Sequence, residues 1–503
     1  MKRSHRYAKV LGCGCSCLVL VLLALVTAVF LILQRVPKTY PGVGSPITPP
    51  PPDSALGGGL DGFASPYLGH TGSWDGKGGA MGGRAKASDL DVEVGMGLRW
   101  TFMPVYWSAL EPDGPVDLTK QTPPAWSALD TFIIAAHERK LNVLMQAPVV
   151  GGNAGSPPAW AGRREKGKSA PADMAAAAAF AGKLAARYAP SGTLATEQGW
   201  QQRYGVRAWE LDNEPDAYLT HWKDQAADYA EFVTKAAAAI RLVDPQAVIL
   251  GPGVMGSGKA PAWVEAALDA PAMRGSPEFR SRGQPYSIGP PLDVVSFHVY
   301  EGLDSAFTGK DRTIEVAFSE IRDVFERWQN RAPGFTYPSK QEYWQTEGNF
   351  DFLGILSQKR RAAWRIQFFT RAFAAGIRKV LVMDASSPEQ LAVRAYIRAL
   401  PNPFPMQRAD DRVTALSGTF VSFCHLDNTN ADAGRVWILW AVAGAGDAEA
   451  SVPCVREQIK RVLVDGSETS MIRTNGVLRI QLPGDKKMAP PVILIDRPAP
   501  FNP

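Results

Sequence analysis

Short apolar runs of strand type alternate with amphipathic helical stretches through most of the chain, and this rhythm limits the folds open to it. Helical spacing of apolar residues marks Ala172–Tyr188, Ala226–Leu242, Thr313–Trp328 and Gln358–Ile377. Seven strand-like runs are clear: Leu98–Pro104, Leu141–Ala147, Val206–Leu211, Ala247–Leu250, Leu292–His298, Glu342–Thr346 and Val380–Met383. A first strand near Tyr67–His70 would bring their number to eight. The alternation predicts an α/β fold, a (β/α)8 TIM barrel over residues 62–400.

The N-terminus predicts a membrane anchor. Leu11–Leu33 is an uncharged run of 23 residues, long enough to span a bilayer. A cleaved signal peptide is the alternative, but no small-x-small cleavage site precedes Gln34. Four basic residues precede the run: Lys2, Arg3, Arg6 and Lys9. Their position predicts a cytoplasmic N-terminus and an extracellular or periplasmic barrel. Residues 1–36 are therefore expected to form a cytoplasmic tail and a transmembrane signal anchor.

The segments on either side of the predicted barrel differ from it in composition. Residues 37–61 are rich in Pro and Gly, which favours a semi-rigid linker. Residues 401–503 predict a β-sandwich accessory domain. Its expected strands are Thr419–Phe423, Val436–Val442, Arg461–Val464, Val477–Leu482 and Val492–Ile495. The domain could be a structural cap on the barrel or a sugar-binding module. Cys424 and Cys454 belong to this part, and spacing leaves both a disulfide and two buried thiols open.

Composition and motifs argue against several classes of partner. The net charge of +5 is small and its charges are scattered, so no nucleic-acid partner is expected. Gly251–Gly256 fits GxGxxG and Gly253–Lys259 nearly completes a P-loop, but Ala260 and Pro261 follow, so we interpret a turn and expect no nucleotide. The six His residues are dispersed and no GxSxG occurs, so neither a metal nor another cofactor is predicted.

Two strand-like runs end in a carboxylate. Trp209–Pro215 breaks off into Asn213-Glu214-Pro, and Glu342–Asn349 carries Glu347 just before a glycine. A carboxylic acid beside a hydrogen-bonding amide suits glycoside hydrolysis, which also needs a second carboxylate. The spacing leaves room for about three strand-plus-helix units, so the two fall on strands four and seven. An N-terminal helix cap for Glu214 and an arginine-paired carboxylate for Glu347 are the structural alternatives.

These motifs resemble those of the clan A glycoside hydrolases, nearest the family 39 or family 5 types. The resemblance covers roughly residues 60–400. It implies a retaining β-glycosidase in which Glu214 is the acid/base and Glu347 the nucleophile. The activity it implies is hydrolysis of O-glycosidic bonds in a β-linked glycan or polysaccharide by double displacement.

The resemblance also implies a set of substrate contacts. His298 and Tyr300 alternate correctly for one face of strand six and would contact substrate and orient the nucleophile, although a core role for His298 stays open. Tryptophans near strand ends, Trp74, Trp107, Trp160, Trp209 and Trp344, are candidates to stack on sugars, and about two of them should do so. The expected substrate-binding residues are Asn213, His298, Tyr300, Trp344, Asp384, His70 and Trp107.

The sequence departs from the clan at two places. Phe102 stands where an Arg usually supports the nucleophile, and Met383 stands where a Trp commonly floors the site, with Asp384 a replacement contact. These changes leave open a degenerate barrel that serves as a glycan-binding or scaffolding ectodomain. A transglycosylase is a second alternative, because water and sugar compete for one glycosyl-enzyme. Neither oligomeric state nor sugar specificity follows from the sequence.

Overall fold

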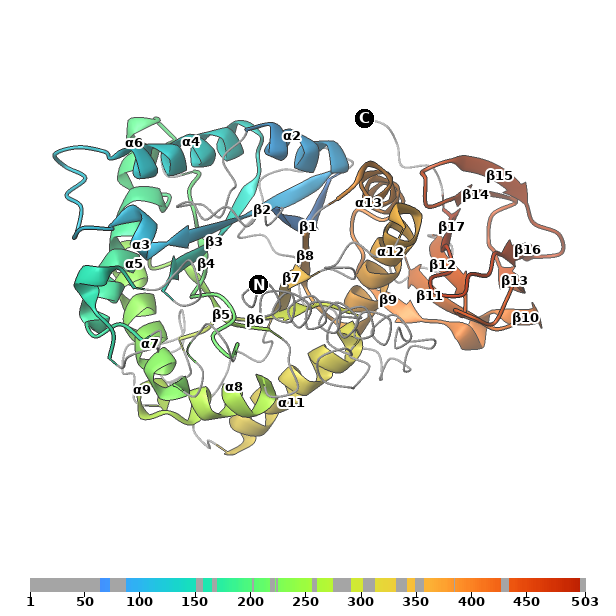
Figure 1. The fold of residues 1–503 in the computed structure, drawn as a ribbon. Helices are drawn as coiled ribbons and strands as arrows, with labels where there is room; N and C mark the ends of the chain where they lie inside the picture. The colour runs from blue at the N-terminus through green and yellow to red at the C-terminus, as the bar shows by residue number, and fades with distance from the viewer. Residues whose placement is uncertain are drawn as a thin grey trace, which may run out of the picture.

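Eight parallel strands close into a barrel in the computed structural model (Figure 1). The structure describes residues 64–72, 87–150, 157–164, 170–200, 203–217, 222, 225–255, 260–274, 291–301, 313–331, 342–348, 357–383, 385–426 and 434–497. The strands pair in chain order, and they are β1 (Ser65–Gly72), β2 (Leu98–Tyr106), β3 (Asn142–Val149), β4 (Ala208–Glu210), β5 (Val248–Val254), β6 (Val294–Val299), β7 (Glu342–Gly348) and β8 (Lys379–Met383). The predicted barrel is confirmed.

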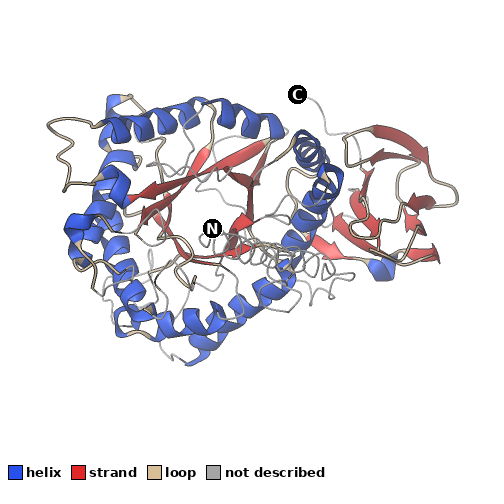
Figure 2. Cartoon of the chain, in the orientation of Figure 1, coloured by secondary structure: helices blue, strands red, loops and turns tan. Residues whose placement is uncertain are grey.

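Helices surround the strands as an outer ring (Figure 2). They are α2 (Ala87–Met96), α3 (Trp107–Leu110), α4 (Pro124–Glu138), α5 (Met174–Tyr188), α6 (Thr193–Glu197), α7 (Ala226–Val243), α8 (Ala260–Asp269), α9 (Pro271–Arg274), α11 (Ile314–Arg331), α12 (Gln358–Ala375) and α13 (Ser387–Ala399), with a 3-10 turn at Ala159–Ala161. Local signals fix several of their ends. Asp173 caps α5 by accepting from the Ala175 and Ala176 amides, and Gly376 ends α12 in the left-handed region.

The barrel interior begins as an apolar layer. Trp100 and Trp344 meet edge to face with their ring centroids 5.2 Å apart, and the Lys379 ammonium lies 5.0 Å from the first ring and 4.9 Å from the second. The same cluster includes Phe102, Leu144, Ala208, Leu250, Val294 and Leu381. This layer fills one end of the barrel and leaves the carboxyl ends of the strands to polar side chains.

A β domain follows the barrel and packs beside α12 and α13 (Figure 1). Its two sheets have the orders β10-β13-β16 and β15-β14-β17-β12-β11-β9. Their strands are β9 (Met406–Arg408), β10 (Thr414–Ser417), β11 (Phe420–Leu426), β12 (Arg435–Ala441), β13 (Ala448–Pro453), β14 (Gln458–Val462), β15 (Glu468–Ile472), β16 (Val477–Leu482) and β17 (Val492–Asp496), with a 3-10 turn at Asp410–Arg412. The pairs within both sheets are antiparallel, so the predicted C-terminal β domain is confirmed.

The two cysteines of the β domain, Cys424 and Cys454, are buried free thiols, which decides against the disulfide. Both lie in the apolar cluster between the sheets. Burial raises the pKa of each thiol to about 12, so both stay protonated at neutral pH.

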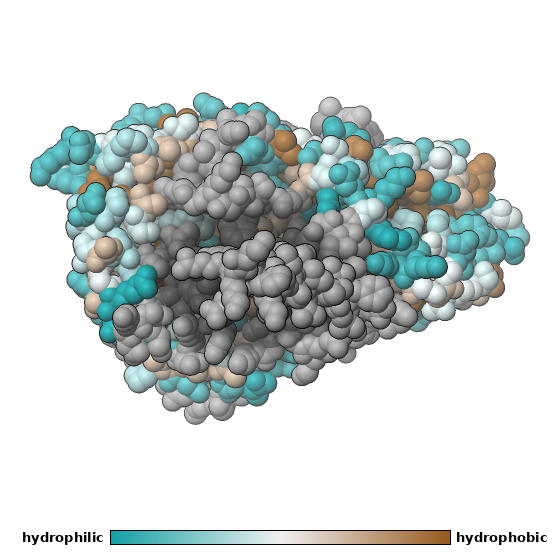
Figure 3. All heavy atoms as spheres, in the orientation of Figure 1, coloured by the Kyte–Doolittle hydropathy of each residue, from teal (hydrophilic) through white to brown (hydrophobic). Residues whose placement is uncertain are grey.

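The predicted membrane anchor and the predicted linker lie outside the described residues, as do Trp74 and Asp384. Within the described part of the chain, no helix combines the length and apolar character needed to cross a bilayer. On the face drawn in Figure 3, hydrophobic residues of the described surface are scattered among hydrophilic ones.

Candidate active site

The backbone around Glu214 leaves the strand geometry early. β4 ends at Glu210, and both Asp212 (φ 69°) and Glu214 (φ 42°) adopt left-handed torsions that are unusual for residues with a side chain. Hydrogen bonds hold this conformation: Asp212 Oδ1 accepts from the Val150 amide at 3.2 Å, and the Glu214 amide donates to the Gly253 carbonyl at 3.1 Å. Strain of this kind persists only where the surroundings over-determine it, and it gathers at functional sites.

Gly253 explains the glycine-rich stretch that ends β5. Its φ is +56°, and a Cβ there would lie 3.2 Å from Glu210 Oε1, closer than side chains normally pack. Its amide donates to Ser296 Oγ at 3.0 Å while its carbonyl accepts from Glu214. Gly253, which lies within the stretch that resembles a nucleotide-binding motif, therefore anchors the Glu214 backbone.

The structure brings Glu214, His298, Tyr300 and Glu347 together at the carboxyl ends of β4, β6 and β7. The Tyr300 hydroxyl donates to Glu347 Oε1, and His298 Nδ1 lies 3.0 Å from Glu214 Oε1. One oxygen of each glutamate and one nitrogen of His298 all lie within 4.8 Å of one another. His298 therefore contacts Glu214, whereas the resemblance placed both His298 and Tyr300 at the nucleophile.

The electrostatics of this cluster follow from its burial. Burial lowers the pKa of His298, but the carboxylates of Glu347 and Glu214 outweigh it and raise the pKa to about 9. Burial also raises the pKa of Glu347, and the Glu214 charge adds to this, while His298 and the Tyr300 hydrogen bond act against it. At neutral pH the imidazole is thus a cation between two carboxyl groups.

A polar layer lies between these groups and the apolar interior. Glu210 is buried and accepts hydrogen bonds from Gln146 Nε2 at 3.1 Å and Thr346 Oγ1 at 2.7 Å. Gln146 also donates to Asn213 Oδ1 at 2.9 Å, so it orients the amide that precedes Glu214. Gln146 and Thr346 were not predicted, because single polar residues within apolar strand runs carry no sequence motif.

Two further groups near the glutamates were not predicted. Asp216 accepts from the Met255 amide at 2.8 Å; burial, with the Glu214 charge adding to it, raises its pKa to about 7. Tyr106 ends β2, and burial and the nearby Glu347 charge raise its pKa. Asp216 follows Glu214 by two positions, and Tyr106 lies two positions beyond the predicted strand Leu98–Pro104, which the structure extends to Tyr106. Position near a strand end was the only available signal for either.

Three of the five tryptophans considered for stacking on sugar do not fit that role. Trp107, Trp209 and Trp344 are fully buried, so no ring face is open to a ligand. Trp107 donates to Glu111 Oε2 at 3.0 Å and packs against Trp160, a half-buried residue. The prediction of Trp107 and Trp344 as substrate contacts is corrected for this reason: Trp344 fills the apolar interior of the barrel, and Trp107 packs against Trp160 and Phe180.

The remaining predicted contacts lie at the strand ends. His70, in β1, is half-buried with Nδ1 3.3 Å from Glu93 Oε1. Asn213 is half-buried beside Gln146. Phe102 belongs to the apolar interior, so this position of β2 places no guanidinium beside the nucleophile. Met383 Sδ lies 3.2 Å from the Tyr300 hydroxyl. Tyr300 is therefore held between Met383 and Glu347.

The cluster also has a spacing that suits a cation. Glu214, His298 and Glu347 each offer one ligand atom within 4.8 Å of the others. A carboxylate, a carboxylate and an imidazole are an ordinary donor set for a divalent ion. The same spacing also fits an arrangement without a metal ion, in which a cationic histidine lies between two carboxylates.

The chain resembles known glycosidases in part of its sequence and in its fold. Residues 151–279, about a quarter of the chain and including Glu214, match the profile of glycoside hydrolase family 44. A comparison with curated proteins finds no match. A glucosidase from Croceicoccus marinus has a similar structure, with a TM-score of 0.53, 13% identity, and 87% of this chain and 97% of that chain covered.

Two further solved structures are similar at the same level. A bifunctional glucanase-xylanase from a metagenome library has a TM-score of 0.51 and 13% identity, covering 87% of this chain and 97% of that chain. A family 30 endoxylanase from Clostridium papyrosolvens has a TM-score of 0.50 and 12% identity, covering 88% of this chain and 98% of that chain. These likenesses show the fold alone, and the family 44 match supports a glycoside hydrolase; families 39 and 5 are not confirmed.

Proposed function

We propose that the chain is a retaining glycoside hydrolase in which Glu214 is the acid/base and Glu347 the nucleophile. The observation that carries the proposal is the spacing of the two carboxyl groups, whose nearest oxygens lie within 4.8 Å. Retaining enzymes hold their carboxyl groups about 5–5.5 Å apart, whereas inverting enzymes need about 6.5–9.5 Å to admit water. This close spacing favours direct attack by a carboxylate.

The reaction takes two displacements. Glu347 attacks the anomeric carbon while the bond to the leaving oxygen breaks and the Glu214 proton passes to that oxygen. Glu214, now a carboxylate, then takes a proton from water as the water oxygen attacks the anomeric carbon and releases Glu347. Each step inverts the anomeric centre, so the product keeps the configuration of the substrate.

The surrounding groups place the single proton that this cycle needs. Two carboxyl groups this close disfavour the state in which both are ionised. The Tyr300 hydroxyl donates to Glu347 and favours its charged form, which opposes part of the rise that burial causes in its pKa. His298 keeps Glu214 in place and supplies a positive charge to the pair.

The proposed substrate is a β-linked glucan or xylan. Support comes from the family 44 match and from the glucanase, xylanase and glucosidase activities named for the similar structures. Asn213 would bind a sugar hydroxyl beside the acid, because its amide is oriented by Gln146. His70, at the end of β1, is proposed to contribute a further polar contact.

Proton NMR of a reaction on aryl β-glucosides, aryl β-xylosides, glucan and xylan tests the proposal. We expect the first product to appear as the β-anomer and to mutarotate later. An α-anomer as first product would contradict the retaining mechanism. Binding of the polysaccharide without turnover would favour the degenerate glycan-binding barrel, and transfer to added sugar in preference to water would favour a transglycosylase.

A further inference from the structure

β7 contains a β-bulge immediately before the proposed nucleophile. Phe297 of β6 pairs with Gln345, but His298, the next residue of β6, pairs with Glu347, so Thr346 is an extra residue in β7. Neighbouring residues of a regular strand point to opposite faces of the sheet. An extra residue breaks that alternation and re-aims a side chain, which is a common use of bulges beside active sites. The direction of the Glu347 side chain therefore depends on how the bulge is held.

A buried polar layer lies directly above the apolar layer of the barrel interior. Its three members are almost wholly buried, with at most 2% of each exposed, so they do not contact a ligand. The pleat of each strand explains their position, because residues two apart point to the same face. They are Gln146, Glu210 and Thr346, and each follows by two positions a residue of the apolar layer on its own strand: Leu144, Ala208 and Trp344.

Glu210 joins the strands that carry the two proposed catalytic glutamates. Its Oε1 accepts from Thr346 Oγ1 at 2.7 Å, and its Oε2 accepts from Gln146 Nε2 at 3.1 Å. β4 and β7 are not neighbours in the barrel, because β5 and β6 lie between them. The bond to Thr346 therefore crosses the barrel interior, and it holds the bulge residue that directly precedes Glu347.

The same carboxyl group also supports the acid/base side of the site. Gln146 Nε2 donates to Asn213 Oδ1 at 2.9 Å as well as to Glu210, so it links the carboxyl group to the residue before Glu214. Glu210 also fills the space beside Gly253, whose carbonyl accepts from the Glu214 amide at 3.1 Å. The contacts toward both catalytic glutamates therefore start at one carboxyl group.

We propose that Glu210 is a positioning residue that sets the separation of the two catalytic glutamates. Through Thr346 it fixes the bulge that aims Glu347, and through Gln146 it fixes the amide that precedes Glu214. Glu210 is fully buried, so it acts through these neighbours and not on the substrate. This inference rests on the proposed hydrolysis and deepens it.

Kinetics of the full chain on an aryl β-glycoside separate the two contacts. Thr346→Val keeps the branched shape and removes the hydroxyl, so kcat should fall about tenfold or more while KM changes less than about twofold, because nucleophile position matters only during reaction. Gln146→Leu should instead raise KM several-fold, because it frees the Asn213 amide that would bind a sugar hydroxyl. Added to Glu210→Ala, Thr346→Val should cost no further kcat, since its effect passes through Glu210.

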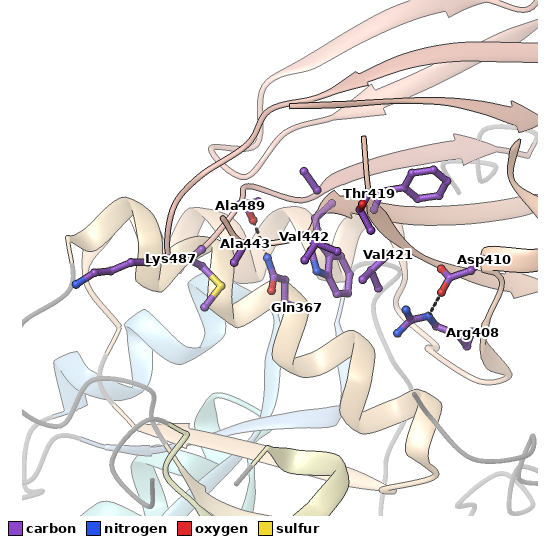
Figure 4. A pocket seen from close by; sticks show the side chains of 13 residues that line it. Gln367, Arg408, Asp410, Thr419, Val421, Val442, Ala443, Lys487 and Ala489 are labelled. Atoms are coloured by element: carbon purple, nitrogen blue, oxygen red, sulfur yellow. Dashed lines mark hydrogen bonds and ion pairs between the residues drawn. The ribbon is translucent and has the colours of Figure 1, made fainter. Parts of the chain in front are cut away.

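Two matched variants control for the loss of a buried polar side chain. Thr370→Val removes a buried hydroxyl of α12 that donates to the Ile366 carbonyl at 2.7 Å. Gln367→Leu removes a buried amide that donates to the Ala489 carbonyl at 2.6 Å, in the wall of a cavity of about 280 Å³ between α12 and the β domain (Figure 4). Neither residue lies on a barrel strand, so both variants should keep wild-type kcat and KM.

Crystal structures of the variants test the positioning without turnover. In Glu210→Ala the nearest carboxyl oxygens of Glu214 and Glu347 should move beyond 4.8 Å, and Thr346→Val gives the same measurement if Glu210→Ala does not fold. An unchanged separation would overturn the proposal, as would equal losses of kcat in Thr346→Val and Thr370→Val. A wild type that hydrolyses no glycoside would refute the proposed hydrolysis, and the separation in the variants would still decide the role of Glu210.

Discussion

At the residue scale, the proposed acid/base is held by its backbone as much as by its side chain. Glu214 has a φ of 42°, and its amide is anchored on Gly253, whose own φ of +56° suits glycine. Glu210 fills the space that a Cβ on Gly253 would need. The position of the Glu214 carboxyl therefore depends on a residue that carries no side chain.

Gly253→Ala tests this dependence. We expect the free energy of unfolding to fall by about 1–3 kcal/mol, from left-handed strain and from contact with Glu210, and kcat to fall with it. Gly476→Ala is the matched control, because Gly476 also has a positive φ of +82° but open space around its Cβ position. Chemical denaturation of both variants gives the comparison; equal losses of stability with unchanged kcat would refute the role of Gly253.

His298 should make stability depend on pH. Its pKa is raised from 6.5 to about 9, so protonation favours the folded state: the stabilisation is complete below pH 6.5 and is lost as pH rises toward 9. The size is on the order of 3 kcal/mol. Thermal unfolding of wild type should show a falling Tm across this window, and His298→Gln should flatten it.

His137→Gln serves as the control for that experiment, because burial lowers the pKa of His137 and it cannot contribute to a loss of stability above pH 6.5. A wild-type Tm that is constant from pH 6.5 to pH 9, or an unchanged slope in His298→Gln, would count against a protonated His298 between the glutamates.

Strand-end position was enough to predict that Glu214, His298, Tyr300 and Glu347 meet, because parallel strands bring their carboxyl ends to one edge. It was not enough to predict which partner His298 takes, since that depends on rotamers and on the break after Glu210. Trp344 was misjudged because the sequence does not reveal how deep in the barrel a strand residue lies; it fills the apolar layer.

At the element scale, α12 fixes the ends of two strands. Arg371 donates to Glu301 at 2.8 and 2.6 Å and to Glu315 at 3.0 Å, and all three side chains are buried. Glu301 directly follows Tyr300, so this network sets the chain beyond β6. Arg365, on the same helix, donates to the Met383 carbonyl at the end of β8.

Arg371→Leu should therefore lower the free energy of unfolding by about 3–5 kcal/mol, because it leaves the Glu301 and Glu315 carboxylates buried without their cation. Arg360→Leu, on the same helix, breaks a pair with Asp485 in which both side chains are partly exposed, 33% and 26%, and should cost about 1 kcal/mol or less. Urea denaturation measures both. Similar losses for the two variants would mean that the buried network has no special role.

Two of the strands that the sequence analysis missed have weak patterns. β10 is exposed at every position and β15 nearly so, and neither carries the apolar alternation of a half-buried strand. The central strands β12 and β17 are almost wholly buried and were predicted from their apolar runs.

At the scale of the whole molecule, we propose that a membrane anchor over Leu11–Leu33 and a linker over residues 37–61 present the barrel outside the cell membrane. Protease added to intact cells should then remove the barrel while an internal marker stays intact. Deleting residues 1–61 should release the protein from the membrane fraction. A barrel protected from protease while a known external protein is digested would contradict this orientation.

The proposed assignment of Glu214 and Glu347 to different steps is tested most directly by azide rescue of their alanine variants on an activated aryl β-glycoside. Glu214→Ala should still form the glycosyl-enzyme, and azide should restore turnover and give the β-azide. Glu347→Ala should lose activity by several orders of magnitude, and azide entering the vacated space should give the α-azide. Proton NMR distinguishes the two products. The same azide anomer from both variants, or wild-type turnover in either, would contradict the account.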